Sequence, residues 1–147
     1  MDYQFAEKKI SDIFKCNKSS ILTEIVKYLH DNFNYYNWVG IYIVEGNDLI
    51  LGPWKGPHAT EHIKIPIGKG ICGAAAASGK TEIISDVNED ERYLSCFVST
   101  KSEIVVPIKK DGKILGEIDI DSDKKDAFTD EDKVFLEKIA DMLAKHI

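Results

Sequence analysis

The chain has 147 residues, of which 44% are hydrophobic and 30% are charged. This composition is typical of a folded globular protein, so we expect one domain over residues 1–147. The net charge of −6, from 25 acidic and 19 basic residues, argues against nucleic acid as a partner. No apolar run approaches the roughly 18 residues of a membrane span, and the N-terminus lacks the pattern of a secretory signal. We therefore expect a cytoplasmic protein without a membrane partner.

The first third of the chain predicts helices. Apolar residues recur at three- and four-residue steps between residues 19 and 33, which is the pattern of an amphipathic helix. A weaker helix is expected over residues 3–15. The apolar positions of the stronger helix are Ile21, Leu22, Ile25, Val26, Leu29 and Phe33.

The middle of the chain predicts strands. Aromatic and β-branched residues occupy 38–44, and an apolar run at 49–54 follows the turn signal Gly46-Asn47. Shorter strands are expected at 63–67 and 81–84. Between them, the alanines after Gly70 favour a short helix that ends at Gly79.

The last third predicts a loop, a hairpin and a helix. Residues 86–102 are polar and unperiodic, so we expect a long loop with one helical turn. Strands at 103–110 and 113–121 flank an Asp-Gly turn. A final helix is expected to begin at Thr129, with Val134, Phe135, Met142 and Leu143 on its inner face. This order indicates an α+β fold, a central antiparallel sheet flanked by N- and C-terminal helices, and the terminal helices could support a homodimer.

Carboxylates gather on the predicted hairpin. Asp119 and Asp121 are two residues apart, so they share one face of their strand, and Glu103 lies on the neighbouring strand. Trp38 and Tyr42 likewise share a face. One interpretation is an ordinary solvent-exposed sheet face. The other is a covered cluster, in which the acids raise one another's pKa, hold an amino group and donate a proton.

The three cysteines, an odd number, argue against a disulfide framework in a reducing cytosol. Cys16 is expected to be a small core residue. Cys72, near a helix start, either has a lowered thiol pKa or only packs the alanine helix. Cys96 lies in the loop, seven residues before Glu103. A reactive thiol with a second one nearby makes a redox couple through a sulfenic acid.

Local motifs for bound groups are weak. The chain has no Cys-x-x-Cys or His-x-x-x-His pair, so the sequence predicts no dedicated zinc site. Gly68-Lys69-Gly70 lacks the other elements of a nucleotide-binding loop. We therefore expect no cofactor and no metal.

Together, several segments resemble GAF domains and, among them, the free methionine-R-sulfoxide reductases. The resemblance covers about three quarters of the chain, from Trp38 to the final helix. The matching segments are NWVGIY at 37–42, LGPWKG at 51–56, IPIGKGICG at 65–73, SEIVVPI at 102–108, GEIDIDS at 116–122 and FTDED at 128–132.

The resemblance implies reduction of free L-methionine-(R)-sulfoxide, with thioredoxin as the electron source. It implies that Cys96 attacks the sulfoxide and that Cys72 resolves the resulting sulfenic acid. The substrate pocket implied by the family consists of Trp38, Tyr42, Glu103, Asp119 and Asp121.

Two departures from the family pattern keep an alternative open. His62 stands ten residues before Cys72, where the family usually has a third cysteine. The segment YLSCF at 93–97 replaces most of the family's usual Gly-His-Ile-Ala-Cys-Asp. The alternative is a non-catalytic GAF module that binds a small molecule as a sensor.

Overall fold

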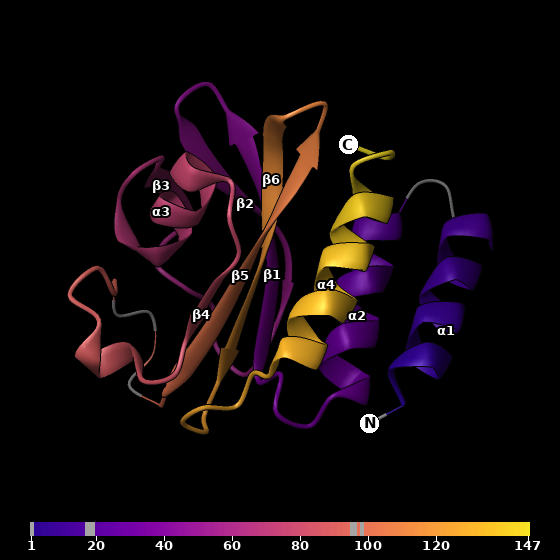
Figure 1. Cartoon of the computed structure of the whole chain (residues 1–147), viewed down its shortest axis with the longest axis horizontal. Coiled ribbons are helices and arrows are strands. Elements are labelled where there is room, and N and C mark those ends of the chain that lie inside the picture. The colour runs from indigo at the N-terminus through magenta and orange to yellow at the C-terminus, as the bar shows by residue number, and fades with distance from the viewer. Residues whose placement is uncertain (1, 17–19, 95–96, 98) are drawn as a thin grey trace.

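A computed structural model describes residues 2–16, 20–94, 97 and 99–147. The elements follow the predicted order along the chain (Figure 1). They are α1 (Tyr3–Cys16), α2 (Ile21–Asn32), β1 (Trp38–Glu45), β2 (Asp48–Lys55), β3 (Lys64–Pro66), α3 (Gly70–Ser78), β4 (Glu82–Ile84), the 3-10 turn Val87–Glu89, β5 (Ser102–Lys110), β6 (Lys113–Ser122) and α4 (Asp130–Leu143).

The strands form one antiparallel sheet of six strands in the order β3-β2-β1-β6-β5-β4. β6 lies at the centre, between β1 and β5, although it is the last strand in the chain. The β5–β6 hairpin turns through Asp111 and Gly112, both with positive φ, as the Asp-Gly signal predicts. The α+β fold with a central antiparallel sheet is therefore confirmed.

One face of the sheet carries the main apolar core. α2 and α4 pack directly on this face, and α1 lies outside them (Figure 1). The sheet contributes β-branched side chains that alternate along each strand. They are Val39, Ile41, Ile104, Val106, Ile108, Ile118 and Ile120, each at most 1% exposed.

The other face of the sheet is covered by α3 and the segments around it (Figure 1). α3 ends at Gly79, whose left-handed φ of 70° allows its N–H to bond the carbonyl of Ala75. The covering layer is thin and is built from short elements. This side of the molecule holds the polar side chains considered below.

Two sequence predictions about the core are wrong. Val134 is 53% exposed, because the buried stripe of α4 runs through Phe135, Leu136 and Ile139, and Val134 lies about 100° before Phe135 on the helix. Cys16 is exposed rather than a core residue, because the buried side of α1 consists of Ala6 and Ile10.

The start of α4 is fixed as predicted. The Thr129 hydroxyl accepts the backbone N–H of Asp132, and the Asp132 carboxylate accepts the backbone N–H of Thr129, which makes a complete capping box. Within the described ranges, no helix combines the length and the apolar character that crossing a membrane requires.

Candidate active site

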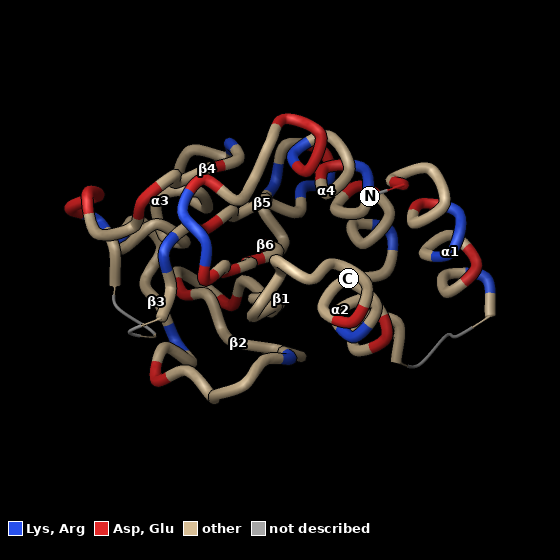
Figure 2. The backbone as a smooth tube through the Cα atoms, turned by 90° about the horizontal axis from the view of Figure 1, so that it is seen from below, with Lys and Arg blue, Asp and Glu red and all other residues tan. Residues whose placement is uncertain are grey.

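The register of the central strands brings the predicted acids to one place. β6 directs Glu117, Asp119 and Asp121 to the same face, because side chains alternate along a strand. Figure 2 shows acidic positions, in red, along the backbone of β6. Asp121 is paired with Glu103 on β5 and with Trp38 on β1. The positions predicted separately from three segments therefore form one continuous patch.

The acids of this patch are buried. The exposed fractions are 5% for Glu103, 3% for Asp119 and Asp121, and 0% for Glu117. The interpretation of a solvent-exposed sheet face is therefore wrong, because α3 and its flanking segments cover this side. Glu117 was missed as a site residue, although the Glu117-x-Asp119-x-Asp121 alternation places it on the same face.

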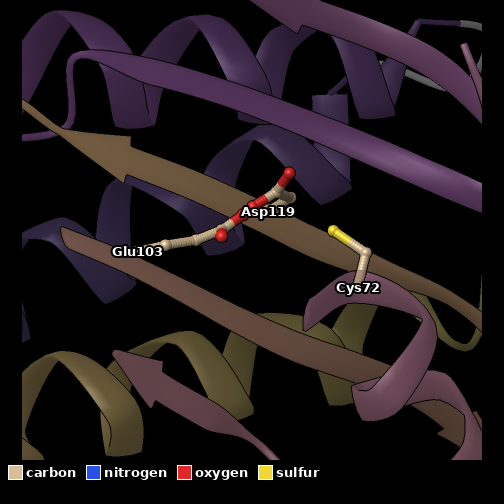
Figure 3. A group of neighbouring side chains, drawn as sticks. All are labelled: Cys72, Glu103 and Asp119. Atoms are coloured by element: carbon tan, nitrogen blue, oxygen red, sulfur yellow. The ribbon is translucent and has the colours of Figure 1, made fainter. Parts of the chain in front are cut away.

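Cys72 faces the acids from the first turn of α3. Its Sγ atom and one carboxylate oxygen each of Glu103 and Asp119 all lie within 4.8 Å of one another. Figure 3 shows these three side chains pointing toward a common point from α3, β5 and β6. The thiol, 6% exposed, is thus enclosed together with the acids.

Burial dominates the electrostatics of the patch. Loss of hydration raises the pKa of Glu117 and of Asp121 well above the ordinary carboxyl value, and the charge of Asp119 raises both further. Burial also raises the pKa of Asp119, although hydrogen bonds with Glu103 and Cys72 act against the rise. These raised pKa values agree with the interpretation of a covered cluster, with burial rather than mutual repulsion of the acids as the larger cause.

The Cys72 thiol shows the same effect. Burial raises its pKa well above the ordinary value, and the nearby acids, Asp119 first, raise it further. The interpretation of a thiol with a pKa lowered by the helix N-terminus is therefore wrong. Burial, and after it the negative charges around Cys72, outweigh the dipole of this short helix.

Trp38 forms an aromatic wall beside the acids. Its indole is 3% exposed and stacks on Trp54, with ring centroids 6.1 Å apart. A Cβ atom at Gly40 or Gly56 would lie 2.4 Å from the Trp38 ring, so only glycine at these positions admits the indole. The Trp38 Nε1 atom is buried and has no hydrogen-bond partner among the described residues.

Tyr42 lies on the same strand face as Trp38, as predicted. Its hydroxyl donates a 2.7 Å hydrogen bond to the backbone carbonyl of His62. Tyr42 and His62 line a cavity together with Cys72, Glu103 and Asp119. The remaining lining residues are Ile65, Ile71, Tyr93 and Leu94.

The cavity has a volume of about 20 Å³, which is room for about one water molecule. A bound amino acid therefore requires its lining to move. Among the lining residues, Tyr93 and Leu94 come from the predicted loop, which includes the predicted helical turn at Val87–Glu89. Arg92 in this loop is held by Glu82 and Asp90, at 3.0 and 2.8 Å.

Cys96 lies outside the described residues, so its predicted position relative to the patch stays a prediction. Its chain neighbour Phe97 is described, and the Phe97 ring lies 6.0 Å from that of Trp38. Phe97 itself therefore lies against the aromatic wall of the site.

This arrangement can bind a cation and supply protons. None of the described residues that line the cavity is a lysine or an arginine, and the electrostatic effect of His62 acts against the rise in the pKa of Asp119. A ligand with an ammonium group can satisfy the ionised acids. A carboxyl that remains protonated can donate to a ligand oxygen.

Comparison with known proteins gives one family model, described as GAF domain, that matches residues 17–147. The free methionine-R-sulfoxide reductase of Saccharomyces cerevisiae is 44% identical over 133 residues, which cover 88% of this chain and 71% of the yeast protein.

Two solved structures show the same architecture. Staphylococcus aureus fRMsr, in complex with substrate, has a TM-score of 0.89 and 40% identity, and the match covers 99% of this chain and 95% of that one. The free methionine-R-sulfoxide reductase of Neisseria meningitidis, also with its substrate, has a TM-score of 0.91 and 32% identity, covering 98% and 87%.

Proposed function

This chain belongs to the GAF-domain family of free methionine-R-sulfoxide reductases, and we propose that it reduces free L-methionine-(R)-sulfoxide with Cys96 as the nucleophile. The observation that carries the proposal is the enclosed patch of Glu103, Asp119 and Asp121 around the Cys72 thiol. An enclosed set of acids beside a thiol goes beyond what a simple apolar binding pocket needs.

The substrate binds through its charge and its methyl group. The α-ammonium of a free amino acid pairs with the ionised acids of the patch. The S-methyl group packs on the Trp38 indole. A carboxyl with a raised pKa stays protonated and donates to the sulfoxide oxygen, which is the oxygen that must leave.

The first chemical step transfers the oxygen to Cys96. The Cys96 thiolate attacks the sulfoxide sulfur while an acid of the patch protonates the oxygen. Methionine leaves with its sulfur reduced by two electrons, and Cys96 is oxidised by two electrons to a sulfenic acid. Glu103 and Asp119 or Asp121 are the proposed proton donors.

The second step forms a disulfide. The Cys72 sulfur attacks the Cys96 sulfenic sulfur, and the hydroxyl leaves as water with the proton that Cys72 loses. The bond requires the two Cα atoms to come within about 7 Å. A dithiol protein of the thioredoxin class then reduces the disulfide by thiol exchange. A cytoplasmic location provides such a reductant.

The oligomeric state is a separate proposal. We expect a homodimer through the terminal helices, and α1 and α4 present the exposed side chains of Phe5 and Val134. Light scattering of the purified chain checks this expectation, and the reductase mechanism does not depend on it.

The decisive experiment measures coupled turnover of the two methionine sulfoxide epimers, first with dithiothreitol and then with thioredoxin. We expect turnover of the R epimer with both reductants and none of the S epimer. Cys96→Ser should form no methionine even in a single turnover, whereas Cys16→Ser, at an exposed cysteine, should match the wild type.

Two outcomes would change the assignment. One equivalent of methionine from Cys96→Ser would move the nucleophile, most plainly to Cys72. Saturable binding of methionine sulfoxide without any turnover would support the sensor alternative. Peptide mapping after oxidation by the substrate should find a Cys72–Cys96 disulfide, and a Cys16–Cys96 disulfide would overturn the resolving role of Cys72.

A further inference from the structure

The group formed by Cys72, Glu103 and Asp119 has the composition of a metal site. One ligand atom from each residue lies within 4.8 Å of the other two, and all three residues are buried (Figure 3). The residues come from three separate elements, α3, β5 and β6. This explains why no local spacing motif in the sequence predicts the group.

A second observation at the same place concerns carboxyl oxygens that are buried without a donor. The Oδ1 atom of Asp119 is buried without a hydrogen-bond partner among the described residues. Both carboxyl oxygens of Glu117, two residues earlier on the same face, are also buried without a hydrogen-bond partner among the described residues. Buried carboxylates in this state are costly unless a cation or a proton neutralises them.

We propose that a thiophilic divalent cation, with Zn²⁺ as its representative, binds in this patch with Cys72 Sγ and one oxygen each of Glu103 and Asp119 as ligands. A thiolate ligand favours Zn²⁺ over Mg²⁺ and Ca²⁺, which prefer all-oxygen sites. Three protein ligands leave a fourth position of the zinc tetrahedron for water.

The geometry is close to what zinc requires. Bond lengths of about 2.0–2.3 Å place the ligand atoms of a tetrahedral zinc ion roughly 3.3–3.8 Å apart. The observed limit of 4.8 Å exceeds this by about 1 Å, which small side-chain rotations can supply. The backbone register that carries Glu103 and Asp119 needs no change.

The consequence for activity rests on the proposed function. A metal ion on Cys72 removes the proposed resolving thiol, and its bonds to Glu103 and Asp119 remove the acids that hold the substrate. The cation is therefore a reversible inhibitor that competes with methionine sulfoxide. Chelation restores the enzyme without any redox step.

The binding test is independent of turnover. Co²⁺ is titrated into the full, reduced chain with a phosphine reductant in place of thiols. We expect about one equivalent to bind, with a thiolate-to-cobalt charge-transfer band that Zn²⁺ abolishes. The band should persist in Cys16→Ser and in Cys96→Ser and should be lost in Cys72→Ser. Asp119→Asn should weaken binding at least about 10-fold.

The outcomes separate the metal site from the enzyme assignment. Absence of the band in the wild-type chain, or its persistence in Cys72→Ser, overturns the site without relying on the folding of any variant. A band without reductase activity would keep the site and reject the proposed function. Reductase activity that micromolar Zn²⁺ and subsequent chelation leave unchanged would reject the inhibition.

Discussion

Two groups of buried carboxylates in this molecule differ in one respect, the hydrogen-bond donors around them. Asp132 at the start of α4 is 1% exposed and accepts the hydroxyls of Tyr35 and Tyr36, each at 2.6 Å, and that of Tyr3 at 3.2 Å. Thr129 donates its backbone N–H and its hydroxyl to the same carboxylate. Asp132 thus ties α1, the segment after α2 and α4 together.

Among the patch acids, Asp119 and Asp121 are about as deeply buried but are less completely satisfied. Asp119 and Asp121 each have an oxygen without a partner among the described residues, and burial raises the pKa of both. The contrast teaches that burial alone does not separate a structural carboxylate from a functional one. The supply of donors does, because a carboxylate oxygen without a donor remains available to a ligand.

The largest effect that we expect from a substitution is a loss of catalysis when a patch acid is replaced. Asp121→Asn should lower kcat/KM for the free R epimer about 10²–10⁴-fold, the usual loss when acid–base assistance is removed. The matched control is Asp141→Asn, at an exposed position on α4. Steady-state kinetics check both. Near-normal turnover by Asp121→Asn, together with Asp119→Asn and Glu103→Gln, would make the patch a merely structural feature.

The second effect is on stability. Asp132→Asn should lower the free energy of unfolding by about 2 kcal/mol, because an amide NH₂ then faces the donors of Thr129. The kcat/KM of the folded protein should change less than about threefold, since α4 packs on the face of the sheet opposite the patch. Urea unfolding measures the first quantity, with Asp130→Asn on the exposed side of α4 as control. A loss of kcat/KM in Asp132→Asn as large as that in Asp121→Asn would contradict the distinction between a structural Asp132 and functional patch acids.

The third and smallest effect depends on pH. Burial raises the folded-state pKa of Glu117. Its favourable contribution to the free energy of unfolding is therefore complete below the unfolded pKa of about 4.3, and this contribution is lost as the pH rises through the folded-state pKa. Glu117→Gln removes this loss, and we expect it to stabilise the protein by about 1–2 kcal/mol at pH 8 and negligibly at pH 4.

Urea unfolding at the two pH values checks this prediction. Glu45→Gln, at an exposed residue, is the matched control and should show no pH-dependent gain. A Glu117→Gln variant that is equally destabilised at both pH values would mean that Glu117 accepts a structural hydrogen bond.

The strand pattern predicted most of this architecture. The alternation from Ile118 to Asp121 fixed which side chains share a face, because a strand has a period of two. The same alternation left open whether the acid face meets water or protein. Its cover comes from α3 and from segments far away in the chain, and no local pattern in β6 carries that information.

The incorrect predictions about the site also arise from contacts between segments that are far apart in the chain. The pKa of the Cys72 thiol is raised first by burial and then by acids from β5 and β6, so its place at the start of α3 alone indicated the opposite direction. Glu117 was overlooked because it precedes the Asp119–Asp121 pair, although its spacing equals theirs. The roles of Cys96 and of the reductant followed from the family resemblance and not from any pattern in the residues.

The most direct test of the central claim compares free methionine-(R)-sulfoxide with its N-acetylated form. If the donor-poor acids serve to bind an α-ammonium, removing that charge should lower kcat/KM by at least about 10²-fold, since the ionised acids would then be buried without a partner. Equal kcat/KM for the two substrates would contradict the account, because the patch would then not recognise the amino group.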